Sequence, residues 1–203
     1  MIIFDKYGIK VYACELPEET PERGPQRLST ERNAVKLLLR EAFPADPTIA
    51  ISHYASGAPY LCRLSNDTPI SPEDDNLPSI SISHCKRMAA IAIAPKTMRI
   101  GIDCENGDRI KTLRRVASRF LSPEQTILWQ EFPQSLWAWC IKEAAYKAAL
   151  QPGLPLTDIP LPPTFPTTEP TKETTINLNG IDYNIIKIDV AINGVSLILL
   201  FSE

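Results

Sequence analysis

The segment 135–150, SLWAWCIKEAAYKAAL, has apolar side chains around nearly its whole circumference when it is read as a helix. Such a helix lies mostly buried, so the fold must cover it on most sides. Its only charged residues are Lys142, Glu143 and Lys147, and charges there are costly unless they are paired or bind a ligand. Glu143 and Lys147 stand one helical turn apart, on the stripe that also holds Trp139. From the segment alone, an ordinary Glu–Lys pair with Lys142 reaching outward to solvent remains an equal alternative to a functional site.

A second group of charges lies on the expected strand 99–105. Because side chains alternate along a strand, Gly101, Asp103 and Glu105 share one face and the apolar residues share the other. Two carboxylates on one face repel each other unless they are solvated or bridged, and a divalent cation is an effective bridge. The alternative is an acidic strand end that faces solvent.

Helical and extended patterns alternate irregularly along the chain. The expected helices cover 29–43, 109–120 and 134–150, with a further helix start at Ser122. The expected strands begin with a hairpin within 2–16 and then cover 48–54, 60–64, 80–84, 88–94, 98–105, 181–190 and 195–201. The acidic segment 67–78 is expected to be a loop, and seven prolines preclude regular structure over 152–170. The connections are short hairpins, and the sequence shows no repeated strand–helix–strand pattern. Both observations favour an α+β fold over a doubly wound parallel sheet.

Composition excludes several classes of protein. A net charge of −3 disfavours a nucleic-acid binder, and no apolar run is long enough to span a membrane, so we expect a cytoplasmic protein. The five cysteines contain no CxxC pair, which indicates reduced thiols. Only two histidines are present, so a metal held by side chains would need carboxylates and would be a hard cation, with Mg²⁺ the leading candidate. The glycine spacings match no Walker A loop, dinucleotide fingerprint or nucleophile elbow.

Two blocks of sequence together resemble a known family. The segment 101–105, GIDCE, and the segment 139–147, WCIKEAAYK, resemble in order and spacing the motifs G-[IV]-D-x-E and W-[SC]-x-K-E-[AS]-x-x-K of the 4'-phosphopantetheinyl transferases. Upstream, Ser81–His84 resembles the SHS-like segment of the larger type, which activates peptide synthetases. The resemblance covers about 80–150, and the first eighty residues agree only in general layout.

The resemblance implies an enzyme that transfers 4'-phosphopantetheine from coenzyme A to a serine of an acyl or peptidyl carrier protein of fatty-acid, polyketide or peptide synthesis. It implies that Mg²⁺ is held by Asp103, Glu105 and Glu143. Glu143 would also accept the serine proton, and Lys147 would stabilise or protonate the departing phosphate.

The resemblance also implies a coenzyme A site. His84 with Ser83 would bind a phosphate of coenzyme A, and Lys142 would contact phosphate or a helix neighbour. Arg40 is the expected phosphate contact on the first helix, with Lys36 or Arg32 as alternatives. One departure affects this site, because Gly57-Ala58-Pro59 stands where the family commonly has Gly-Lys-Pro, so a lysine that helps hold coenzyme A is missing.

The implied architecture has two similar α+β halves, 1–97 and 98–203, with the active site in the cleft between them and the chain a monomer. Because Ala58 replaces a lysine, an alternative is a non-catalytic protein of the same fold that binds carrier domains or nucleotides. A third reading is a Mg²⁺-dependent phosphohydrolase that uses water in place of serine.

Five positive charges lie within 109–119, directly after the acidic strand. Carrier proteins are usually acidic, so this segment is the expected docking surface for the carrier, with Arg114 and Arg115 as the expected guides. The alternative is a solubilising helix face.

Overall fold

The computed structural model divides the chain into two compact units, Met1–Arg99 and Ile100–Glu203. The structure describes residues 1–21, 23–65, 68–69, 76–129, 131 and 133–202. Within these residues no helix is both long and apolar enough to cross a membrane. The loop expected over 67–78 lies largely outside the described residues, which show a short strand, β5 (Thr68–Pro69), within it.

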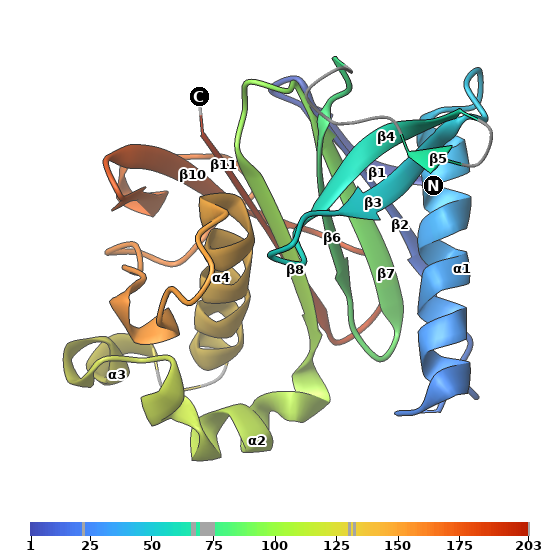
Figure 1. Cartoon of the computed structure of the whole chain (residues 1–203). Coiled ribbons are helices and arrows are strands. Elements are labelled where there is room, and N and C mark those ends of the chain that lie inside the picture. The colour runs from blue at the N-terminus through green and yellow to red at the C-terminus, as the bar shows by residue number, and fades with distance from the viewer. Residues whose placement is uncertain (22, 66–67, 70–75, 130, 132, 203) are drawn as a thin grey trace. The chain divides into compact units, whose positions relative to one another are not determined.

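The first unit is built on an antiparallel sheet of four strands in the order β1-β2-β7-β6. These strands are β1 (Ile2–Lys6), β2 (Ile9–Glu15), β6 (Ser79–His84) and β7 (Met88–Ala94). Helix α1 (Pro25–Ala42) packs on β2 and β7, with Ala34 and Leu38 against Tyr12 and Ile91 (Figure 1). A smaller sheet joins β3 (Ile49–His53), β4 (Pro59–Ser65) and β5.

The start of α1 differs from the prediction. The helix begins at Pro25, four residues before the expected caps Ser29 and Thr30, because a proline is well suited to the first helical position. Gly24 precedes it with a φ of 99°, a backbone conformation that glycine adopts without strain. The early start adds one turn, which brings Arg27 into the helix.

The second unit is also built on a four-stranded antiparallel sheet, in the order β8-β11-β10-β9. Its strands are β8 (Ile100–Asn106), β9 (Thr175–Leu178), β10 (Ile181–Ile188) and β11 (Val195–Ser202). Helix α4 (Gln134–Ala149) packs on β8 and β11 and contributes much of the core (Figure 1). The helix predicted over 134–150 is confirmed, and so is the closing meander, whose first turn is Asn179-Gly180.

The connection from β8 to α4 is less regular than predicted. In place of one helix over 109–120, the structure has the 3₁₀ turn η1 (Gly107–Arg109), helix α2 (Ile110–Arg115) and a second 3₁₀ turn, η2 (Ala117–Arg119). Val116 leaves the helical conformation, and its N–H lies within reach of three carbonyl groups at the end of α2. Helix α3 (Pro123–Trp129) follows. After α4, the described residues of the proline-rich segment 152–170 form the 3₁₀ turn η3 (Leu156–Asp158), and a further 3₁₀ turn, η4 (Lys172–Thr174), follows the segment.

Candidate active site on β8 and α4

Gly101 lets strand β8 and helix α4 approach each other closely. A Cβ atom added at Gly101 would lie 1.8 Å from the Ala144 carbonyl oxygen and 3.1 Å from the Ala148 amide nitrogen. The backbone of the helix therefore lies directly against this face of the strand. Because Asp103 and Glu105 alternate in phase with Gly101, their side chains share the face on which α4 packs.

The acidic face of β8 is buried. Asp103 retains 7% of its accessible surface and Glu105 retains 5%. The alternative of a solvent-facing strand end is therefore wrong, because α4 covers the strand. Buried carboxylates are costly unless they are compensated, and each of the two has a cation beside it.

Asp103 is paired with Lys147 of α4. The Lys147 Nζ atom donates to Asp103 Oδ1 at 2.7 Å and to the Ile102 carbonyl oxygen at 2.9 Å. Burial disfavours the charge on Lys147, but the ion pair and hydrogen bond with Asp103 outweigh it, so the pKa of Lys147 is raised. The ion pair of Lys147 thus reaches across to the strand instead of along the helix to Glu143. Burial raises the pKa of the Cys140 thiol well above its ordinary value, and the nearby charges of Asp103 and Glu105 raise it further.

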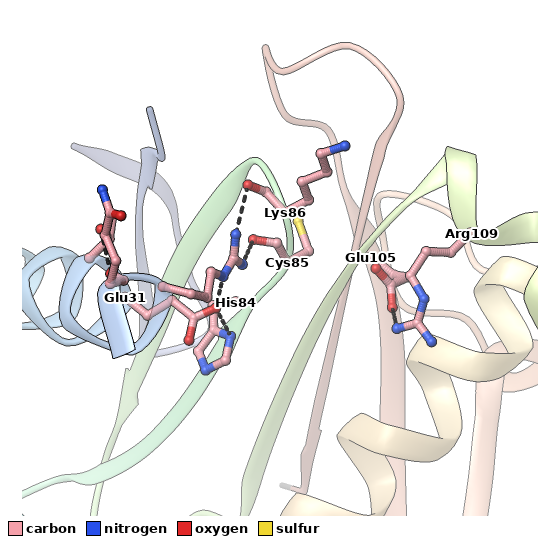
Figure 2. A network of polar contacts seen from close by, with 9 residues as sticks. Glu31, His84, Cys85, Lys86, Glu105 and Arg109 are labelled. Atoms are coloured by element: carbon pink, nitrogen blue, oxygen red, sulfur yellow. Dashed lines mark hydrogen bonds and ion pairs between the residues drawn. The ribbon is translucent and has the colours of Figure 1, made fainter. Parts of the chain in front are cut away.

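Glu105 is held by two donors. The Asn106 amide donates to Oε1 at 2.9 Å, and the Arg109 guanidinium forms an ion pair with Oε2 (Figure 2). Burial raises the pKa of Glu105 and repulsion from Asp103 adds to this, although the Asn106 hydrogen bond and the Arg109 charge act in the opposite direction.

Glu143 experiences the charges of the same cluster. Burial raises its pKa, Asp103 and Glu105 raise it further by repulsion, and Lys147 and Arg109 lower it. In the part of the chain that the structure describes, no hydrogen bond or ion pair involves its carboxylate. Glu143 is therefore the carboxylate of this cluster with most freedom to take a proton or a ligand.

The chemistry of these donors fits a hard divalent cation, because the three carboxylates offer only oxygen atoms and repel one another. No three His, Cys, Asp or Glu side chains among the described residues are grouped so that they could hold a metal ion as they stand. Asp103 and Glu105 are instead neutralised by Lys147 and Arg109. A bound cation would have to replace or share these two pairings.

Lys142 is completely buried. Its Nζ atom donates to the carbonyl oxygens of Leu156 at 2.7 Å and of Ile159 at 2.6 Å, and Gln125 donates to the Ile159 oxygen as well. Burial lowers the pKa of Lys142 to about 7, although the nearby Asp158 acts to raise it. The alternative in which Lys142 reaches outward to solvent is therefore wrong. Its ammonium group binds the backbone of the proline-rich segment and is not at a surface where a phosphate could contact it.

The residues of the first unit that were predicted to bind coenzyme A differ in how exposed they are. His84 is exposed at the end of β6, whereas Ser83 before it is buried. Arg40 lies in the last turn of α1 and donates to the Ile49 carbonyl oxygen at 3.1 Å. The contact from α1 to His84 comes instead from Glu31, whose Oε1 lies 3.0 Å from His84 Nδ1.

Sequence reasoning missed Arg27 and Glu31. Both are buried charged residues on the inner face of α1, and they form an ion pair across one turn. Their i, i+4 spacing was the available signal, but Arg27 precedes the expected start of the helix.

Residues 99–186 match the family described as the 4'-phosphopantetheinyl transferase superfamily. The matched region runs from the residue before β8 into β10, so it contains Asp103, Glu105, Glu143 and Lys147. A search of curated proteins found no match to the chain.

Proposed function

Since residues 99–186 belong to the 4'-phosphopantetheinyl transferase superfamily, we propose that this chain transfers the 4'-phosphopantetheine group of coenzyme A to a serine of an acyl or peptidyl carrier protein. The observation that carries the proposal is the cluster of Asp103, Glu105, Glu143 and Lys147 within the matched region, on one strand and the helix packed against it. In the reaction, the serine Oγ bonds to the phosphorus next to pantetheine, the bond from that phosphorus to the bridging oxygen breaks, and adenosine 3',5'-bisphosphate leaves.

Each residue of the cluster has a proposed part in this reaction. Glu143 accepts the serine proton, for which its raised pKa is favourable. Lys147, whose raised pKa keeps it protonated, donates toward the departing phosphate oxygen. Mg²⁺ bound by Asp103, Glu105 and Glu143 would neutralise charge that develops on the leaving group.

The coenzyme A contacts in the first unit are also proposals. His84 is accessible, with 46% of its side chain exposed, and its ring can contact a phosphate. Ser83 and Arg40 remain candidates from the family resemblance, whereas the buried Lys142 is no longer proposed for this site.

The test is an intact-mass assay with coenzyme A, Mg²⁺ and an apo carrier protein. We expect the carrier to gain the mass of phosphopantetheine, and adenosine 3',5'-bisphosphate to appear in equal amount. An unchanged carrier with intact coenzyme A would favour a binding protein, and an unchanged carrier with cleaved coenzyme A would favour a phosphohydrolase. A chelator should stop the reaction, and Glu173→Gln, an exposed acid outside the cluster, should leave it unchanged.

The proposed carrier surface lies on α2 and η2, where Lys111, Arg114, Arg115 and Arg119 are exposed. Two of the arginines in this segment are paired with acidic residues. Arg114 contacts both carboxylate oxygens of Glu131, at 3.0 and 2.9 Å, and Arg109 is paired with Glu105. Arg115 has no ion pair among the described residues, so its charge is the more available to a partner.

Arg115→Gln is therefore expected to raise the KM for an acidic carrier several-fold and to leave the KM for coenzyme A unchanged, because long-range attraction mainly sets the association rate. Arg114→Gln is the matched control on the same helix and should have a smaller effect, since Glu131 already offsets that charge. Steady-state kinetics at increasing ionic strength provide the measurement. If the KM for the carrier does not change with ionic strength, the segment does not attract the carrier electrostatically and is ordinary solvated surface.

A further inference from the structure

A buried ion pair on α1 holds a carboxylate against the ring of His84. The Glu31 Oε1 atom accepts from the Arg27 Nε–H and lies 3.0 Å from His84 Nδ1 (Figure 2). The side chains of Arg27 and Glu31 are 9% and 8% exposed, whereas that of His84 is 46% exposed. The contact therefore joins a buried carboxylate to an accessible imidazole.

Arg27 fixes the position of this carboxylate. Its two terminal nitrogens donate to the carbonyl oxygens of Cys85, at 2.6 Å, and Lys86, at 3.2 Å, in the turn that follows β6. The guanidinium thus ties the first turn of α1 to the residues directly after His84. Glu31 cannot move freely, because its partner is anchored to the backbone at two points.

The contact assigns a hydrogen to Nδ1 of His84, since a carboxylate oxygen accepts and cannot donate. With Nδ1 turned to Glu31, a ligand that hydrogen-bonds to the ring must do so through Nε2. An anionic oxygen there requires an N–H donor, which Nε2 supplies in the doubly protonated ring. The carboxylate at Nδ1 and an anion at Nε2 therefore favour the same state of the ring.

We propose that Glu31 is a positioning residue, which holds the His84 ring through Nδ1 so that Nε2 contacts a phosphate of coenzyme A. The inference rests on the proposed function for its ligand, but the Glu31–His84 contact itself can be tested without any ligand. The two parts can therefore fail separately.

The first measurement is ¹⁵N NMR of the imidazole rings at a pH where they are neutral. The chain has only two histidines, His53 and His84, so a His53→Gln variant leaves one ring to observe. We expect the Nδ1–H tautomer for His84, and a shift toward the Nε2–H tautomer in Glu31→Ala. The same tautomer in both proteins would overturn the positioning role. Because Glu31→Ala leaves a buried arginine without its carboxylate, Glu31→Gln is the second variant, and its amide oxygen should retain the Nδ1–H form.

The second measurement is steady-state transfer with coenzyme A as the varied substrate. Glu31→Ala should raise the KM for coenzyme A about tenfold at unchanged kcat, as expected when the partner that orients a ligating histidine is removed. Glu31→Gln should have a KM for coenzyme A close to that of the unsubstituted protein. Glu41→Ala is the control on the same helix, because Glu41 pairs with the N-terminal ammonium instead.

Two outcomes distinguish the possible failures. If His84→Gln raises the KM for coenzyme A but Glu31→Ala does not, Glu31 has no positioning role and the phosphate contact of His84 stands. If neither variant changes that KM while transfer proceeds, the phosphate contact is overturned, and this inference with it. The expected result is that His84→Gln and the double variant raise the KM equally, because Glu31 acts only through the ring.

Discussion

Replacing Asp103 by alanine is expected to lower kcat for transfer about a hundredfold and to change the KM for coenzyme A little. Asp103 accepts a hydrogen bond from Lys147 of α4 and is one of the proposed Mg²⁺ ligands, so its removal alters the charge at the place where charge develops in the transition state. Single-turnover kinetics in saturating coenzyme A measure the loss. Unchanged turnover in excess Mg²⁺ would contradict the assignment of Asp103.

A double variant separates the catalytic loss from a loss of stability. Asp103→Ala leaves Lys147 without its ion-pair partner, in a site where that side chain is 28% exposed. Breaking a largely buried pair is destabilising, whereas removing both partners is often nearly neutral. Asp103→Ala combined with Lys147→Met should therefore unfold at a higher temperature than Asp103→Ala alone, yet be no more active. Because Lys147 also has a part in the proposed reaction, recovery of activity together with stability would contradict the proposed parts of both residues.

Gly101→Ala is expected to destabilise the second unit by about 3 kcal/mol and to lower the transfer rate about a hundredfold. The added Cβ would meet the Ala144 carbonyl oxygen at 1.8 Å, which is helix backbone and cannot rotate away. Helix α4 must shift, and both Glu143 and Lys147 shift with it. Denaturant unfolding and kcat are the two measurements.

Gly107→Ala is the matched control for this substitution. Gly107 directly follows β8, and a Cβ there would meet its nearest atom, the Gly194 carbonyl oxygen, at 3.3 Å. We expect a much smaller change in both stability and rate. Equal effects at the two glycines would indicate that loss of backbone flexibility, and not the closeness of α4, explains the result.

The central elements of the candidate site could be predicted from sequence because their patterns are local. The apolar circumference of 134–149 predicts a buried helix, and the alternation in β8 places Asp103 and Glu105 on one face. What covers that face is α4, which begins 28 residues after the end of β8, so alternation could not distinguish a solvent-facing acid pair from a buried one. Gly101 was the local signal of close packing, since glycine in a strand often marks a close approach of backbone.

The remaining contacts depend on partners that a local pattern cannot identify. Lys142 binds carbonyl oxygens of the proline-rich segment, whose conformation follows from its turns and not from any periodicity. Glu31 has Arg27 one turn away, but its second partner, His84, comes from a strand far along the chain. A periodic pattern identifies the face of a helix and does not identify what the face contacts.

The pairing of β8 with β11 affects the order in which the second unit can form. Ile100 pairs with Phe201 and Asn106 with Val195, so the first strand of the unit is hydrogen-bonded to its last. This pairing requires a long loop to close. The entropy cost of closing the loop comes before the stabilising contacts form, so folding is slower than for local contacts. During synthesis the strand that carries Asp103 and Glu105 has to wait for β11 before its ladder can form. A chain shortened before β11 would leave β8 without this hydrogen-bonded partner. The backbone edge of the strand that carries both acids would then be unpaired.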